Sequence, residues 1–312
     1  MNKVKKAFSL LLALVLCASV FSSCRGTFNA ENGKLTIVAT LFPQYDFARE
    51  IAGSYADISL LLKPGVESHS YEPTPQDIIK INNADVFLYT GEYMEAWAHD
   101  IIKSIESDVI VVDVSKGISL DTLKEHSHIE GDSHNHENYD PHIWTNPVFA
   151  KTMVESISSA LQQADLENAH IYAENAENYT KKLDKLDEDM FNMLKEARQD
   201  TICFGDRFAM HYFAKHYNLN YISAYDSCSE ETEPSAKALA EIIDTINEKE
   251  IKAVFYAELT QQTAARTISE STGAKLLMLH SCHNVSKAEL KSGATYISLM
   301  YQNLENLREG LK

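Results

Sequence analysis

Side chains that can bind a metal ion stand directly after several short apolar runs of this 312-residue chain. Such runs predict buried strands, and in an open α/β sheet ligands bind beyond the carboxyl ends of the strands. The side chains at these positions are His69, His142, Asp206, Glu258, His280 and His283. They come from both halves of the chain, so two lobes that close on one cleft would bring them together.

Two of these histidines lie in loops that proline makes stiff. His69 lies in GVESHSYEPTP, residues 65–75, and His142 lies in DPHIW, residues 140–144. A histidine that binds a metal usually needs an acceptor for its other ring nitrogen, and both loops contain carboxylates that could serve. The candidate acceptors are Glu67, Glu72 and Asp140. We therefore expect His69 and His142 to be ligands rather than ordinary loop residues.

The other candidates have competing structural roles. Asp206 is either a ligand or the N-cap of the helix that follows it. Glu258 is either a ligand or an acceptor of hydrogen bonds from a neighbour, and His211 and His216 are interpreted as surface or core-edge residues. Two or three imidazoles with one carboxylate suit zinc, whereas two imidazoles with two carboxylates favour manganese or iron.

A further feature is the stretch HSHIEGDSHNHENYDPH, residues 126–142, which combines histidines with acidic residues. Its low complexity predicts a solvated loop, and its histidines predict metal binding; both can hold. We expect an accessory metal loop that contains His126, His128, His134 and His136. Such a loop would collect ions weakly and supply the tighter site.

The elements that position these residues alternate between strands and helices. The predicted strands are rich in Val, Ile, Leu and aromatic residues without polar alternation, which is typical of parallel strands covered on both faces. They are residues 35–41, 58–62, 86–89, 109–114, 201–204, 221–224, 253–256 and 276–279. Helical patterns lie between most of them, for example at residues 233–248. This order predicts an α/β fold with four strands in each half.

One long helix is expected between the two halves. Residues 168–197 contain no Gly or Pro, and buried-type side chains recur there at alternating steps of four and three. The stripe consists of Tyr172, Ala176, Tyr179, Leu183, Leu186, Met190 and Met193. A coiled-coil partner is the alternative, but strands on both sides favour a helix that braces two lobes.

The N-terminus has the features of an export signal. Lysines precede an apolar run from residue 7 to about residue 20, and small residues follow. The run is too short to span a membrane comfortably. It ends at Phe-Ser-Ser-Cys, which resembles a bacterial lipobox, so we expect cleavage before Cys24 and a lipid on that residue. A cleaved signal without a lipid is the alternative.

The net charge and the cysteines limit what the protein can bind and which disulfides it can form. The formal net charge is −17, which disfavours nucleic acid and anionic membrane surfaces and is compatible with cation binding. Cys203 lies in an apolar run and is expected in the core. Cys228 and Cys282 then remain as a pair, and an exported protein permits a disulfide, although their spacing alone does not decide it.

These motifs together resemble the zinc- and manganese-binding substrate-binding lipoproteins of bacterial ABC transporters. Residues 65–73 are similar to the family's Gly-x-x-x-His-x-Tyr-Glu-Pro loop, and residues 140–144 are similar to its Asp-Pro-His-x-Trp motif. Stretches within residues 233–255 and 293–304 are similar as well, so the resemblance covers nearly all of the chain after Cys24.

The resemblance implies a fold, a cargo and a partner. The fold would be two (β/α)4-type lobes joined by one long backbone helix, with the metal site in the cleft between them. The cargo would be Zn²⁺, with Mn²⁺ second, and the partner an ABC permease in the cytoplasmic membrane. His69 and His142 would each supply one ligand.

The chain departs from the family pattern at the third and fourth ligands. Where the family has a third histidine, this chain has Arg207 beside Asp206; where the family has a carboxylate in the last strand-end loop, this chain has His280. We therefore expect the two ligand types to be exchanged, so that Asp206 and His280 complete the site. Glu258 and His283 are the alternates.

The same resemblance places Cys228 and Cys282 near the cleft. A disulfide between them is expected, and a thiolate ligand to the metal is the alternative. The expected organisation is a signal peptide at 1–23, a lipidated linker at 24–33, a first lobe at 34–147 with the His-rich loop at 117–140, a linking helical segment at 148–199 and a second lobe at 200–312.

The function expected from the sequence is capture of a divalent metal for import. The protein would be a monomeric receptor outside the cytoplasmic membrane, attached only through its lipid, and not an enzyme. A manganese or iron receptor of the same family is the first alternative. A zinc hydrolase with Glu258 as general base is another, but the chain has no His-Glu-x-x-His helix or nucleophile elbow. A surface adhesin with this fold is the last.

Overall fold

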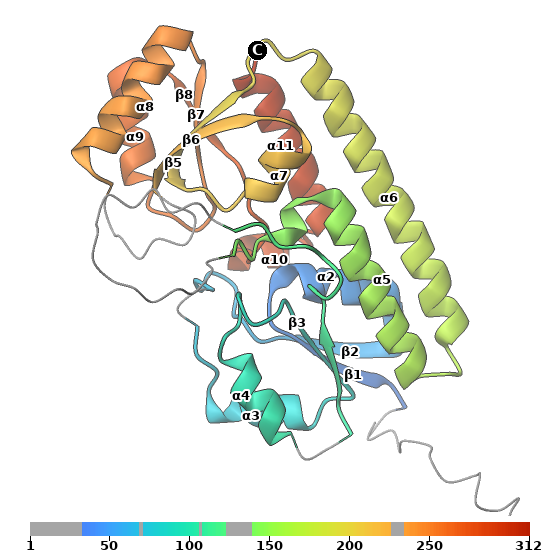
Figure 1. Ribbon diagram of the computed structural model, residues 1–312. Coiled ribbons are helices and arrows are strands. Elements are labelled where there is room, and N and C mark those ends of the chain that lie inside the picture. The colour runs from blue at the N-terminus through green and yellow to red at the C-terminus, as the bar shows by residue number, and fades with distance from the viewer. Residues whose placement is uncertain (1–32, 69–70, 106–107, 123–138, 226–233) are drawn as a thin grey trace, which may run out of the picture. The chain divides into compact units, whose positions relative to one another are not determined.

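Two four-stranded sheets form the framework of the computed structural model (Figure 1). The structure describes residues 33–68, 71–105, 108–122, 139–225 and 234–312. The strands are β1 (Leu35–Ala39), β2 (Ala56–Leu60), β3 (Val86–Tyr89) and β4 (Ile110–Asp113) in the first sheet, and β5 (Thr201–Arg207), β6 (Asn220–Tyr225), β7 (Ala253–Tyr256) and β8 (Lys275–Met278) in the second. The strand orders are β2-β1-β3-β4 and β6-β5-β7-β8, and all of these pairings are parallel.

Helices separate consecutive strands within each sheet, as the alternating pattern predicts. They are α2 (Phe42–Ala52), α3 (Pro75–Asn82) and α4 (Ala98–Ser104) in the first lobe, and α7 (His211–His216), α8 (Ala236–Lys249) and α9 (Thr263–Thr272) in the second. Between the lobes lie α5 (Pro147–Ala164) and α6 (Ala169–Lys195), and the chain ends with α10 (Lys287–Lys291) and α11 (Tyr296–Gly310). Two lobes with parallel sheets confirm the predicted fold class.

Both faces of each sheet are buried, which explains why the strands show no polar alternation. In β1, Ile37 packs in the cluster that includes α2 and α5, whereas its neighbour Val38 packs in the cluster that includes α3 and α4. In β7, Phe255 joins the cluster with α11, and Val254 joins the cluster with α8 and α9. Parallel strands that are buried on both sides have nearly continuous apolar sequences.

Helix α6 is the predicted long helix, and every residue of its predicted stripe is buried. It packs against α2 and α5 of the first half of the chain and against α11 of the second half (Figure 1). Tyr179 illustrates this position, because its ring contacts Phe47 of α2 at a centroid distance of 5.6 Å. The helix therefore braces the two lobes, and no coiled-coil partner is needed to explain the stripe.

Several predicted features lie outside the described residues. They are the signal peptide with Cys24, His69, the four histidines of the accessory loop, and Cys228. Residues from Lys34 to Lys312 cluster as one compact unit. Within the described ranges, no helix combines the length and apolar character needed to cross a membrane.

Candidate functional site

A cavity of about 260 Å³ lies where loops from both lobes meet. The first lobe contributes Glu67 and His142 to its lining, and the second contributes Asp206, Arg207, Glu258 and His283, among others. The second-lobe residues lie at or just beyond the carboxyl ends of β5, β7 and β8, which is where a parallel sheet presents ligands. Four of the candidates named by their position after a strand thus line one cavity.

The imidazole of His142 is held by a buried carboxylate. Its Nδ1 lies 2.8 Å from Oδ1 of Asp140, and its backbone N–H donates to the same oxygen at 2.9 Å. Burial would raise the pKa of Asp140, but the charge and hydrogen bonds of His142 keep that pKa below its ordinary value. An ionised acceptor at Nδ1 favours the tautomer that presents the Nε2 lone pair to a metal.

The second lobe builds the same pair with His283. Its Nδ1 lies 2.9 Å from Oε1 of Glu258, and its Nε2 is buried with no hydrogen-bond partner in the described part of the chain. Glu258 also accepts hydrogen bonds from the N–H and hydroxyl of Ser281, at 2.8 and 2.6 Å. Because its oxygens already accept hydrogen bonds from Ser281 and contact the ring of His283, Glu258 is better suited to orient that ring than to bind the metal itself.

The pKa of Glu258 agrees with that role. Burial would raise it, but the neighbouring His280 and His283 hold it well below its usual range. The carboxylate therefore stays ionised beside the rings. One histidine from each lobe, held by a buried carboxylate, thus lines the same cavity, and such carboxylate–histidine contacts orient zinc ligands in proteins.

Asp206 faces the cavity from within a strand. Because β5 continues to Arg207 and α7 begins only at His211, Asp206 is not an N-cap, and that alternative is wrong. Its Oδ2 accepts a hydrogen bond from Thr260 at 2.7 Å. Burial raises the pKa of Asp206 in spite of that bond. Arg207 opposes this shift, and a metal ion bound in the cavity would oppose it further.

His280 occupies a different environment from the one we expected. It is completely buried and is not among the residues that line the cavity. Its Nδ1 accepts the backbone N–H of Cys282 at 2.9 Å, and its Nε2 lies 3.7 Å from Oε1 of Glu289. Its Nε2, like that of His283, is buried without a hydrogen-bond partner among the described residues, so the difference between the two rings is that only His283 lines the cavity. The geometry thus favours the alternate His283.

Cys282 forms the bend between these two histidines. It has a positive φ of 63°, which is rare for a residue with a side chain, and its thiol is buried and forms no disulfide with another cysteine of the described residues. The predicted partner Cys228 lies outside the described residues, so the disulfide stays a prediction.

The comparisons with known proteins agree with this geometry. Residues 37–310 match the model of the family described as zinc-uptake complex component A, periplasmic (ZnuA). The chain belongs to the ZnuA family. It is 32% identical over 319 residues to the zinc-binding protein AdcA of Streptococcus pyogenes serotype M18, an alignment that covers 98% of this chain but 61% of AdcA. The chain therefore spans less than two thirds of the length of that relative.

Two further relatives match over nearly their whole length. The high-affinity zinc uptake system protein ZnuA of Bacillus subtilis is 33% identical over 310 residues, which is 96% of this chain and 94% of that protein. The crystal structure of the Zn(II)-bound ZnuA-like domain of Streptococcus pneumoniae AdcA superimposes with a TM-score of 0.75 at 30% identity and covers 89% of this chain and 99% of that one.

One cross-lobe contact in this ZnuA-family chain was not foreseen from the sequence. The hydroxyl of Tyr212, on α7, donates to the carbonyl of Asp140 at 2.8 Å and accepts the N–H of Asp121 at 2.9 Å. Asp121 also pairs with His211 and Lys215 of α7. The two ends of the predicted His-rich loop are thus bonded to the second lobe, next to His142. No sequence signal predicts this, because 72 to 94 residues separate the partners.

The described residues do not by themselves complete a metal site. Within residues 33–312, apart from the gaps given above, no three or more His, Cys, Asp or Glu side chains are close enough together to hold an ion. His142 and His283 are therefore two candidate ligands that line one cavity from different lobes rather than a finished coordination sphere.

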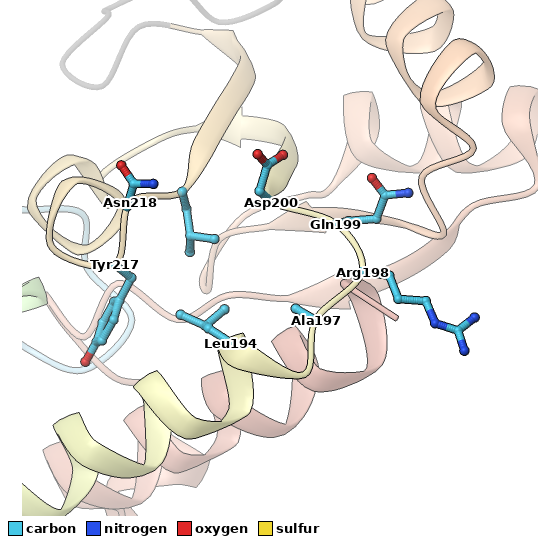
Figure 2. A pocket seen from close by; sticks show the side chains of 8 residues that line it. Leu194, Ala197, Arg198, Gln199, Asp200, Tyr217 and Asn218 are labelled. Carbon is cyan, nitrogen blue, oxygen red and sulfur yellow. The ribbon is translucent and has the colours of Figure 1, made fainter.

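A second hollow, of about 360 Å³, lies where α6 runs into β5 (Figure 2). Leu194, Ala197 and Tyr217 form its apolar side, and Asp200 and Asn218 stand at its other edge. The backbone N–H groups of Arg198 and Gln199 donate to the carbonyl of Leu311, at 2.8 and 3.1 Å. This hollow contains no histidine or cysteine, and we interpret it as part of the junction between α6 and the second sheet.

Proposed function

We propose that this chain captures a divalent metal ion, with zinc preferred, outside the cytoplasmic membrane and delivers it to an ABC permease. The observation that carries the proposal is the pair of buried carboxylate–histidine contacts, Asp140–His142 and Glu258–His283, that reach one cavity from opposite lobes. Membership of the zinc-uptake family supports it, as do the zinc-binding names of its relatives.

The proposed ligands come from both lobes. His69 and His142 would serve from the first lobe, and His283 and Asp206 from the second. His280, the residue that the family pattern aligns with the fourth ligand, is less well supported because it lies outside the cavity lining. Three imidazoles and one carboxylate would favour zinc over manganese.

The location of the protein and its anchor belong to the same proposal. The family is the periplasmic component of a zinc-uptake complex, which agrees with the predicted export signal. A lipid on Cys24 would keep the receptor at the membrane surface, and a monomer would suffice for binding. A hydrolase is less well supported, because the candidate base Glu258 is already bonded to Ser281 and His283. Adhesion remains an alternative that growth experiments would separate from uptake.

The first experiment is a competition titration on the soluble fragment of residues 25–312, stripped of metal. Zn²⁺ and Mn²⁺ are titrated against a chelator of known affinity, with His69→Ala, His142→Ala, Asp206→Ala and His283→Ala as variants. Tight binding of one Zn²⁺ that the histidine substitutions abolish and Asp206→Ala weakens is the expected result. Absence of tight binding to the unaltered fragment would overturn the proposed function.

The His-rich loop makes a separate prediction. Deletion of residues 126–138 should slow zinc uptake when zinc is scarce, while the purified protein keeps its tight site. Growth of the deletion strain is measured across a chelator series beside a strain with a Gly-Ser segment of equal length. Equal growth of the deletion strain and the unaltered strain would show that the loop does not collect ions.

A further inference from the structure

The segment that carries His283 follows the second sheet but is bonded to the first lobe. The indole N–H of Trp144 donates to the carbonyl of Ser281 at 2.7 Å. The backbone N–H of Phe42 donates to the carbonyl of His283 at 3.2 Å, and that of Gly65 donates to the carbonyl of Val285 at 2.9 Å. Three carbonyls of residues 281–285 are thus held by donors of the other lobe.

Asn284 adds a side chain to these backbone bonds. Asn284 is completely buried, and its side-chain amide nitrogen donates to the carbonyl of Lys63 at 2.9 Å and to the carbonyl of Val66 at 2.8 Å. Its Oδ1 accepts the N–H of Val285 at 2.8 Å. Both amide hydrogens and the amide oxygen therefore have partners, and the two donor bonds join the lobes.

The carbonyls that Asn284 holds belong to the loop that forms the first-lobe wall of the cavity. Gly65, which lines the cavity, lies between Lys63 and Val66 in the sequence. Glu67, which also lines the cavity, directly follows Val66. On the other side, Asn284 directly follows His283, whose ring is bonded to Glu258. The side chain of Asn284 thus links the backbone of the cavity wall in one lobe to the residue beside a candidate ligand in the other.

The bend at Cys282 makes this arrangement possible. Cys282 adopts its positive φ between Ser281 and His283, and its N–H donates to Nδ1 of His280. His283 is therefore attached to the second lobe through its ring and to the first lobe through its own carbonyl and through Asn284. A shift of the residue 63–67 loop would be transmitted to it.

We propose that Asn284 is a positioning residue for metal binding, which fixes the loop of residues 63–67 at a set distance from the ring of His283. The inference rests on the proposed function. Only an amide of this length fits the bonds observed, because aspartate cannot donate to the two carbonyls and alanine leaves both of them buried without their donor.

The test compares Asn284→Asp and Asn284→Ala with a matched control in the same lobe. Asn306→Ala removes a similar bond, from an amide nitrogen to the carbonyl of Met278 at 2.8 Å, and neither Asn306 nor Met278 lines the cavity. Zinc affinity is measured by chelator competition. We expect both Asn284 variants to bind zinc about 10- to 100-fold more weakly, as is typical when a group that orients a ligand is lost. The Asn306 variant should bind as tightly as the unaltered protein.

Two readouts distinguish positioning from a general loss of stability. The first is a double-mutant cycle: in a His283→Ala background, Asn284→Asp should weaken zinc binding by less than threefold, because the residue it positions is absent. The second is the absorption spectrum of bound Co²⁺, which should change in Asn284→Asp and stay unchanged in Asn306→Ala.

The outcomes separate this inference from the proposed function. Unaltered protein that fails to bind zinc contradicts the function itself. Tight binding by the unaltered protein, together with Asn284 variants that bind zinc equally well or that lose affinity additively with His283→Ala, overturns the role of Asn284 and leaves the function standing. If Asn284→Ala does not fold, Asn284→Asp, which preserves the side-chain shape and the acceptor for Val285, provides the same comparison.

Discussion

At the scale of single residues, two histidines three positions apart have opposite environments. Both rings have a buried Nε2 with no hydrogen-bond partner among the described residues, but the ring of His283 lines the cavity, whereas the ring of His280 lies outside its lining and accepts a backbone N–H. The first arrangement can give a lone pair to a metal. The second uses Nδ1 as a structural acceptor and keeps the ring out of the cavity lining.

The two histidines should therefore respond differently to substitution. His283→Ala should lower zinc affinity at least 100-fold with little effect on stability, while His280→Ala should lower the free energy of unfolding by about 2–4 kcal/mol, because it removes a buried acceptor and creates a cavity. Chelator competition and urea denaturation measure the two quantities. The reverse pattern, with zinc affinity lost in His280→Ala alone, would restore the exchange of ligands that the family pattern suggests.

The sequence could predict part of this site but not its last member. His142 was readable because the Asp-Pro-His-x-Trp motif places an acceptor two residues before the ring, and the structure has that contact. His280 and His283 both follow β8 within a few residues, so position alone does not separate them. Which of the two rings faces the cavity depends on the left-handed backbone at Cys282, and a cysteine in the sequence does not predict such a conformation.

At the scale of elements, the strands were the most predictable part of the molecule. Val86–Tyr89 and Ala253–Tyr256 have the predicted bounds, and the others differ by one to three residues at their ends. These strands are buried on both faces, so nearly all of their side chains are apolar, and the resulting apolar runs predicted the strands. The short α7 agrees with the helix expected after Asp206, whereas α10 was not predicted, since a helix of one or two turns shows too little periodicity.

The contact between β5 and α9 depends on Gly205, the residue before Asp206. A Cβ at this position would lie 2.4 Å from Cα of Ala265, closer than atoms can approach. Gly205→Ala should therefore lower the free energy of unfolding by about 1–3 kcal/mol. Urea denaturation tests this value. Adding Ala265→Gly should recover only part of the loss, because the backbone nitrogen of Ala265 would also lie too close, at 2.8 Å.

The bonds from α7 to the ends of the His-rich loop can be tested through Tyr212. Tyr212→Phe removes the hydroxyl that joins the N–H of Asp121 to the carbonyl of Asp140, and should cost about 1–3 kcal/mol of unfolding free energy. Tyr301→Phe is the control, since its hydroxyl bonds only the partly exposed Asp189 and should cost about 0.5 kcal/mol or less. Equal costs for the two variants would mean that the Tyr212 bonds add no stability.

At the scale of the whole molecule, the two lobes are also joined by Asp46 of α2. Its Oδ2 accepts the backbone N–H of Tyr296, the first residue of α11, at 2.7 Å. Burial raises the pKa of Asp46 to about 6, although this bond and Arg49 oppose the shift. Between pH 4 and pH 6 the folded protein thus holds a proton at Asp46 that the unfolded chain has lost.

This difference gives a pH dependence of known sign. A raised carboxyl pKa in the folded state makes the free energy of unfolding fall as pH rises, by about 3 kcal/mol across that window for the two-unit shift. Asp46→Asn should remove this fall when urea denaturation is followed from pH 4 to pH 6.5. Asp165→Asn is the control and should leave the change from pH 4 to pH 6.5 nearly unaltered, because hydrogen bonds from Asn168 and Tyr172 outweigh burial and lower the pKa of Asp165, which confines its contribution to pH values below about 4. A pH dependence that Asp46→Asn leaves unchanged would contradict the assignment.

The closure of the chain at Asp121 and Asp140 has a practical consequence. The N–H of Asp140 donates to the carbonyl of Asp121 at 3.0 Å, and Thr122 and Tyr139 form an antiparallel bridge beside it. Because the ends of the intervening stretch are bonded to each other, its length is nearly uncoupled from the rest of the fold, and closure entropy grows only slowly with added residues. A circularly permuted fluorescent protein inserted there should leave both sheets intact. Since His142 follows two residues after the junction, such a fusion would be a starting point for an optical zinc sensor.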